Sequence, residues 1–348
     1  MMPPGYQPIF ALHRGEHLES LHYGAVAVVD VHGALRAWLG DPQQAAFLRS
    51  AAKPFQALPF VVAGGVAHYQ LTPQELALLC ASHSGTPAHV AVFEGLLQKF
   101  GLQAQQLLCG THPPYHAASA EELRARGEAP NVAHHNCSGK HCGMLAYAKL
   151  RGWRLDDYID PQHPLQQEIV ALFAELAGMR VEQLAIGVDG CSAPNWAAPL
   201  AHTAWAYARL ADPAGLPEAQ AQAAGQIADA MRAHPDMVAG PRRFDTACMQ
   251  HLPGLISKLG AEGFQAFGLP AGFLGPQSPA LGIAIKIADG DARQWASHAV
   301  ALEVLRQLGA LDAGRMAALA DYGPLRPVTN WSGQVVGQAA PCFTLELA

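Results

Sequence analysis

The chain has 348 residues, half of them hydrophobic and 14% charged, with a formal net charge of −6. This length and composition predict one large or two intertwined globular domains, and they exclude global disorder. Acidic and basic residues are mixed without a basic run, which argues against nucleic-acid binding. No apolar stretch reaches the roughly 18 to 20 residues of a membrane span, and we expect no signal peptide. The sequence therefore predicts a cytoplasmic protein without nucleic-acid or membrane partners.

The first predicted elements lie near the N-terminus. Two apolar runs, at 25–30 and 34–39, are joined by a turn and predict a β-hairpin. Residues 43–62 have a helical composition that prolines interrupt, so we expect a short helix that carries Ser50 and Lys53 and bends afterwards.

Helices are predicted for the middle of the chain and strands again for its end. Thr72 to Glu75 forms a capping-box sequence with proline at the first helical position, which predicts a helix through Leu79. Further helices are expected at 86–100, 164–176, 196–210, 217–233 and 293–308, and extended segments at 263–269, 281–288 and 333–347. Strands at both ends indicate an α+β fold. The terminal segments, about 1–60 and 255–348, would share one sheet, and about 61–254 would be the mainly helical part of a single catalytic unit.

Ser50 and Lys53 form an S-x-x-K motif. On a helix these two positions lie on one face, so the lysine amine can reach the serine hydroxyl. A desolvated, neutral lysine could then take the serine proton and produce an activated nucleophile. Ser82, in a polar loop at a helix end, and Lys258, before a predicted strand, complete the order of parts in serine β-lactamases and penicillin-binding proteins. Alternatively, Ser82 caps a helix and the lysines are solvated surface residues.

Other common catalytic signatures are missing from the sequence. It contains no G-x-G-x-x-G, P-loop, H-E-x-x-H or G-x-S-x-G motif, which argues against dinucleotide, nucleotide and α/β-hydrolase chemistry.

The seven cysteines favour free thiols or a metal site, because their number is odd and no export signal is visible. Two of them, Cys137 and Cys191, lie in segments whose glycines and polar residues predict shaped loops, at 136–143 and 187–194. Two such loops could share one zinc ion. No C-x-x-C pair occurs, and two buried structural thiols are the alternative.

Six short strings occur in the order that a known family has. They are R-S-A-A-K-P at 49–54, C-A-S-H-S at 80–84, C-G-T-H-P at 109–113, N-C-S-G-K-H at 136–141, G-V-D-G-C at 187–191 and S-K-L-G-A at 257–261. From about residue 20 to its C-terminus the chain resembles the thermolabile, Ser-Lys type of L-asparaginase. The resemblance implies a serine β-lactamase-like α+β fold with an antiparallel sheet, helices around it, and assembly into a homodimer.

The resemblance also implies roles for particular residues. Ser50 with Lys53 would form one Ser-Lys tandem, and Ser82 with Lys258 the second. The implied zinc ligands are Cys137, Lys140 and Cys191. A lysine ligand needs a neutral amine, which zinc and desolvation together could favour. The implied substrate-binding residues are Arg49, Asn136, His141 and Asp189.

The expected reaction is hydrolysis of L-asparagine to L-aspartate and ammonia through an acyl-enzyme. The sequence leaves open which serine attacks, and analogy with the lactamase arrangement favours Ser50. The alternatives are a glutaminase, another β-lactamase-like amidase or peptidase, and a non-enzymatic zinc-binding protein on the same scaffold. The last would be expected to have lost a serine or lysine of the tandems, whereas all four are present.

Overall fold

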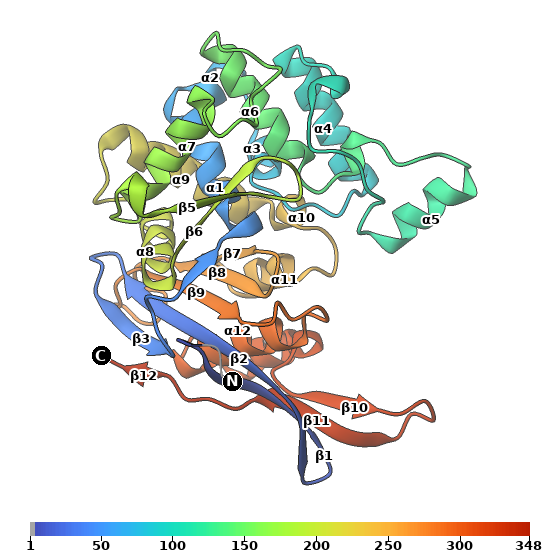
Figure 1. Cartoon of the computed structure of the whole chain (residues 1–348), viewed down its shortest axis with the longest axis vertical. Coiled ribbons are helices and arrows are strands. Elements are labelled where there is room, and N and C mark those ends of the chain that lie inside the picture. Colours follow the sequence, from blue (N-terminus) through green and yellow to red (C-terminus); the bar gives the residue numbers. More distant parts are fainter. Residues whose placement is uncertain (1–3) are drawn as a thin grey trace. The chain divides into compact units, whose positions relative to one another are not determined.

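A computed structural model describes residues 4–348, which form two compact units (Figure 1). Unit 1 comprises the described residues up to Ala51 together with Ala198–Asp212 and His251–Ala348. Unit 2 comprises Ala52–Ala197 and Pro213–Gln250. No helix within 4–348 combines the length and the apolar character that crossing a membrane requires.

Unit 1 is built on a mainly antiparallel sheet. Its strands run in the order β10-β11-β1-β2-β9-β8-β7, and β3 pairs with both β2 and β12. The bounds are β1 Gln7–Arg14, β2 His17–Asp30, β3 Leu35–Leu39, β7 Ile256–Leu259, β8 Phe264–Leu269, β9 Leu281–Ile287, β10 Arg326–Thr329, β11 Val335–Pro341 and β12 Glu346–Leu347. Strands from both ends of the chain thus share one sheet, which confirms the predicted α+β class with an antiparallel sheet.

Two helices of unit 1 pack against this sheet. Helix α8, Leu200–Ala211, contacts β2, β8 and β9, and α12, Trp295–Gln307, contacts β1, β8, β9 and β11. Glycine permits the closest approach: a Cβ on Gly282 of β9 would lie 1.7 Å from the carbonyl oxygen of Ala204 in α8. The remaining elements of this part of the chain are β4 Ala45–Phe47, η1 Arg49–Ala52, α13 Ala313–Ala318 and η5 Ala320–Tyr322.

Unit 2 is mainly helical and is centred on α1, Lys53–Val62, which packs against α6, α7 and α9. Nearly every residue of α1 is buried, as expected for a helix that is hydrophobic on all sides. The other helices are α2 Gly65–His68, α3 Pro73–Leu79, α4 Pro87–Phe100, α5 Ala117–Ala125, α6 Ser138–Leu150, α7 Pro164–Leu176, α9 Glu218–Ala233, α10 Pro235–Val238 and α11 Phe244–His251. Short η2 Ala104–Gln106, η3 Val132–His134 and η4 Val181–Gln183, and the antiparallel pair β5 Ala185–Val188 and β6 Pro194–Pro199, complete the list.

Several predicted elements are confirmed and three are wrong in part. The hairpin of β2 and β3, the capping box at Thr72 and the helices α4, α7, α9 and α12 appear where the sequence placed them. Residues 43–48, expected to be helical, contain β4, and Ser50 lies in η1 rather than in a helix with Lys53. The start of the helix expected at 196–210 is strand β6, because 194–197 pair with β5.

The segment 136–143, predicted to be a Gly-rich loop, is a turn only at 136–137, and residues 138–143 are the beginning of α6. Its glycines serve packing between helices: a Cβ on Gly139 would lie 2.2 Å from the carbonyl oxygen of Leu78, at the end of α3. A Cβ on Gly143 would come within 3.2 Å of the Leu79 side chain. The glycines therefore let α6 approach α3 and do not shape a turn.

Candidate active site

Lys53 and Ser82 form a buried amine–hydroxyl pair in unit 2. Lys53 is the first residue of α1, where Pro54 is tolerated because the first turn needs no backbone donor. Ser82 follows the end of α3. The Nζ atom of Lys53 donates to Ser82 Oγ over 2.8 Å, and Lys53 and Ser82 are only 1% and 5% exposed. The sequence motifs predicted other partners, Ser50 for Lys53 and Lys258 for Ser82.

Two backbone carbonyls complete the surroundings of the Lys53 amine. Nζ also donates to the Ala81 carbonyl oxygen at 2.7 Å and to that of Asn136 at 3.3 Å. Burial lowers the pKa of Lys53 below its ordinary value, although the nearby negative charge of Cys137 acts in the opposite direction. The lower pKa favours the neutral amine, which is the form that can accept a proton from a serine hydroxyl.

The three predicted metal ligands, Cys137, Lys140 and Cys191, lie near this pair. Lys140 Nζ donates to Cys191 Sγ over 2.9 Å, and a hydrogen bond with Cys191 is the main cause that holds the pKa of Cys137 well below its ordinary value. Burial would lower the pKa of Lys140, but the negative charges of Cys191 and Cys137 raise it above its ordinary value. Two sulfurs and an amine converge, as a zinc site with these ligands requires.

A zinc ion at this cluster would need the amine as a protein ligand. Among residues 4–348 no group of three or more His, Cys, Asp and Glu side chains is arranged to hold a metal. With Cys137 and Cys191 as sulfur donors, Lys140 would have to supply the third protein ligand. The donor set fits zinc on condition that the ion replaces the proton that the two thiolates favour on Lys140.

His141 and Asp189, predicted to bind substrate, lie close to the cysteine cluster. His141 is fully buried, and its Nδ1 is 2.6 Å from the Tyr158 hydroxyl, which also accepts the Leu108 N–H at 2.8 Å. Asp189 is half-buried and accepts from the Asn195 amide at 3.5 Å.

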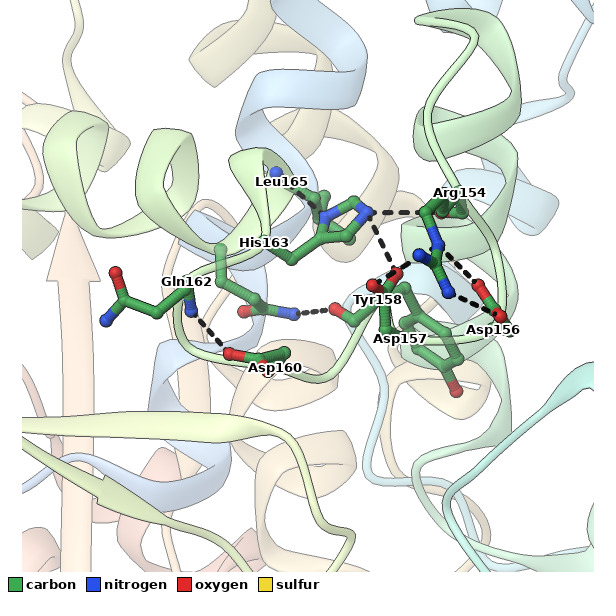
Figure 2. A network of polar contacts seen from close by, with 9 residues as sticks. Arg154, Asp156, Asp157, Tyr158, Asp160, Gln162, His163 and Leu165 are labelled. Atoms are coloured by element: carbon green, nitrogen blue, oxygen red, sulfur yellow. Dashed lines mark hydrogen bonds and ion pairs between the residues drawn. The ribbon is translucent and has the colours of Figure 1, made fainter.

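The loop that presents Tyr158 is held by its own polar contacts (Figure 2). His163 accepts the Leu165 N–H at Nδ1, and its Nε2 is 3.1 Å from the Arg154 carbonyl oxygen. Gln166 donates to the Tyr158 carbonyl oxygen at 2.8 Å. These bonds fix the loop to the start of α7 and so set the position of the tyrosine hydroxyl.

Two histidines that lie in the family strings, but for which the sequence predicted no role, are near the Ser82 loop. His83 accepts the Gly85 N–H at Nδ1, so its Nε2 carries the proton and donates to Ser138 Oγ over 2.8 Å. His112 Nε2 accepts the Asn136 N–H at 3.0 Å and thereby fixes the segment whose carbonyl contacts Lys53. Their presence in the strings at 80–84 and 109–113 was the signal that could have indicated them.

The structure thus brings together part of the predicted site in unit 2. Those residues are Lys53, Ser82, Asn136, Cys137, Lys140, His141, Asp189 and Cys191. Arg49, Ser50 and Lys258 belong to unit 1, where Lys258 is fully buried in β7 and donates to the Leu259 carbonyl oxygen at 3.0 Å. Their pairing with Lys53 and Ser82 stays a prediction.

Comparisons with known proteins give one family match and several distant structural likenesses. The family model described as L-asparaginase II matches residues 10–341. No protein of curated function matches the chain. Solved structures similar to it include that of Mglu in its native form (14% identity, 84% of this chain and 66% of Mglu covered, TM-score 0.44). A probable glutaminase from Bacillus subtilis (12% identity, 82% and 84% covered, TM-score 0.38) and a β-lactamase from Burkholderia ambifaria (14% identity, 81% and 93% covered, TM-score 0.36) are also similar. These likenesses are too distant to support a conclusion about activity.

Proposed function

Because the chain belongs to the L-asparaginase II family and is by that membership an amidohydrolase acting on a small molecule, we propose that it hydrolyses L-asparagine to L-aspartate and ammonia. The observation that carries the proposal is the buried hydrogen bond of 2.8 Å between Lys53 Nζ and Ser82 Oγ. An amine of lowered pKa beside a hydroxyl is the arrangement that activates a serine for attack on an amide.

The proposed steps use this pair directly. Neutral Lys53 takes the proton of Ser82 as Oγ attacks the side-chain carboxamide carbon of asparagine. The tetrahedral intermediate collapses when the lysine returns the proton to the leaving nitrogen, and ammonia departs from an aspartyl ester of Ser82. Water then attacks the ester with Lys53 again as the base, and L-aspartate is released.

The choice of nucleophile differs from the preference drawn from the sequence. Analogy favoured Ser50, whereas the contact with Lys53 supports Ser82. We keep Ser50 and Lys258 as a second tandem whose members assist the same reaction. A diazoketone analogue of asparagine, which alkylates the attacking hydroxyl, separates the two serines.

The decisive experiment combines ammonia release with mass spectrometry of the labelled protein. We expect ammonia from L-asparagine, slower release from L-glutamine, and a single adduct on Ser82. The Ser82→Ala enzyme should lose both turnover and labelling. An adduct on Ser50 would transfer the role of nucleophile to that residue. Faster release from glutamine would make the chain a glutaminase, and covalent labelling by penicillin would favour a peptidase.

We propose in addition that Cys137, Lys140 and Cys191 bind one zinc ion. Zinc would supply a positively charged centre that orders the start of α6 and the turn after β5. The convergence of both sulfurs and the amine supports this proposal.

Metal content and thermal stability test the zinc site without reference to activity. The purified protein should carry about one zinc per chain, lose it to a chelator with a fall in Tm, and recover both on readdition. Cys191→Ser should contain little zinc, whereas Cys248→Ser, a change at a buried cysteine outside the cluster, should retain it. Equal zinc content in all three proteins would refute the site.

Homodimer formation, which the resemblance implies, is proposed here as well. Sedimentation analysis should give twice the mass of the chain, and a monomer at micromolar concentration would contradict it.

A further inference from the structure

Arg243 is a half-buried arginine that borders the loop carrying Ser82. It precedes α11, and its Nη1 atom donates to Ser84 Oγ over 3.3 Å. The guanidinium carbon lies 5.8 Å from the centre of the Tyr115 ring. Arg243 therefore contacts the loop at Ser84, two residues after the proposed nucleophile. No sequence motif drew attention to it.

The segment that precedes Arg243 is bonded to the Ser82 loop at several points. The Ser82 N–H donates to the Val238 carbonyl oxygen at 2.9 Å, and the Ser84 hydroxyl donates to that of Ala239 at 2.8 Å. Gly240 has φ +126°, and a Cβ there would lie 2.7 Å from Ser84 Oγ. The close approach of the two segments thus requires glycine at this position.

Thr246 closes the turn that leads to Arg243. Its Oγ1 accepts the Gly240 N–H at 3.2 Å and is 2.8 Å from the Gly240 carbonyl oxygen, to which it can donate. The Ser84 hydroxyl, which donates to Ala239, has lone pairs left to accept from the guanidinium. The position of Arg243 is therefore set by the fold before any ligand arrives.

The charge of Arg243 has no carboxylate partner within residues 4–348. Its neighbours are the Ser84 hydroxyl, the Tyr115 ring and His89. Burial is the main cause that lowers the pKa of His89, and the positive charge of Arg243 lowers it further. A guanidinium has five N–H donors in a planar fork, and only one of them is bonded to protein here. Leaving a half-buried cation uncompensated is costly, and an anionic ligand that accepts from the fork would remove that cost.

We propose that Arg243 binds the α-carboxylate of the substrate and thereby selects amides that carry a carboxylate group. This inference rests on the proposed asparagine hydrolysis. Two residues of extended chain, from Ser82 to Ser84, span at most about 7 Å. In asparagine, three carbon–carbon bonds separate the amide carbon from the carboxylate carbon. Together with one hydrogen bond they cover a distance similar to the span from Ser82 to Ser84. The carboxylate can then lie on the fork while the carboxamide lies at Ser82.

Two substrates and two neighbouring arginines test the assignment. L-asparagine is compared with 3-aminopropanamide, which is asparagine without its carboxylate. Arg243→Gln should lower kcat/KM for asparagine by about 10- to 100-fold, mainly through KM, and leave the poor turnover of 3-aminopropanamide unchanged. Arg243→Lys should recover part of the loss. Arg242→Gln is the matched control, because Arg242 is exposed, and it should behave as the unchanged enzyme.

A structural role for Arg243 would give a different pattern. Equal losses on both substrates, or a large fall in Tm in Arg243→Gln, would show that the residue only holds the Ser84 loop. Either result overturns the inference and leaves the proposed hydrolysis standing.

Binding of L-aspartate, measured by calorimetry, separates this inference from the proposed activity. The wild-type and Arg242→Gln proteins should bind aspartate, and Arg243→Gln should bind it at least 10-fold more weakly. This result would support the carboxylate site even if no ammonia were released from asparagine. Equal binding by all three proteins, or no binding by the wild type, would contradict it.

Discussion

At the scale of single residues, the surroundings of the Lys53 amine act in opposite directions on its protonation state. Its three contacts, to the Ser82 hydroxyl and to two backbone carbonyls, match the three N–H bonds of an ammonium. Carbonyl oxygens stabilise the charged form, and burial disfavours it and lowers the pKa. When the lysine is neutral, its two N–H bonds can still donate to both carbonyls while its lone pair accepts the Ser82 O–H. The bond to Ser82 then reverses its direction, and the proton can pass repeatedly between Lys53 and the substrate.

Replacing Lys53 tests its role as a base. Lys53→Met should reduce kcat by about 10²- to 10⁴-fold, the range typical of lost proton transfer. Lys53→Arg should be equally inactive, because a guanidinium stays charged at all accessible pH values. Ammonia release from asparagine measures both, with circular dichroism as the check on folding. An active Lys53→Arg enzyme would reduce the lysine to an electrostatic role.

The same pKa predicts the direction of the pH–rate profile. The neutral fraction of Lys53 grows as pH rises, so kcat/KM should increase with pH through a transition below lysine's ordinary value of 10.5. Ammonia release between pH 5 and 10 would show it. A rate that falls over that whole interval would mean that the charged lysine is the active form.

At the scale of elements, local signals predicted those helices whose ends carry strong start and stop residues. The capping boxes at Thr72 and Thr86 act through nearest neighbours and are visible in sequence. Strand β6 was missed because its Ala-rich segment is helical by composition and becomes extended through pairing with β5. The start of α6 was missed because its glycines accommodate α3, a partner remote in sequence.

Replacing either of two glycines by alanine should change the stability of the protein in opposite directions. Gly282→Ala places a methyl group against the backbone of α8 and should destabilise the protein by about 1–3 kcal/mol or more. Gly225→Ala, inside α9 with no atom within 4 Å of the new Cβ, should stabilise it by about 0.5–1 kcal/mol. Urea denaturation measures both. Similar effects of the two substitutions would show that α8 does not lie as closely on β9 as described.

At the scale of the whole molecule, the family was identifiable from short strings, and the match over residues 10–341 confirms it. The strings gave residue types but not partners. Lys53 was assigned to Ser50 because i and i+3 share a helix face, whereas η1 ends before Lys53 and the amine contacts Ser82. Arg243 could not be predicted, because its importance comes from contacts with a loop about 160 positions away in the chain.

Buried histidines predict how stability depends on pH. Burial holds the pKa of His83 well below 6.5 and that of His89 below the same value. The unfolded chain therefore gains protons below about pH 6.5 that the folded chain does not, and each such group removes up to about 1.4 kcal/mol per pH unit. Stability should be full above that pH and should fall as pH decreases towards 5.

Urea titrations at pH 7.5, 6.5, 5.5 and 5 measure this loss. Carboxylates such as Asp30 and Glu75, whose pKa values are lowered from 3.8 and 4.5, contribute only at more acidic pH. A His83→Gln protein should show a shallower slope than the wild type, and an exposed control, His17→Gln, should not. Stability that is constant from pH 7.5 to 5 would contradict the prediction.

The burial of the cysteine thiols has a practical consequence. Six of the seven cysteines are buried, and Cys342, after β11, is exposed. A maleimide dye should therefore attach rapidly at one position near the C-terminus. Every later attachment requires a transient opening of the interior, so its rate reports how often the core around Cys80, Cys142 or Cys248 comes into contact with solvent.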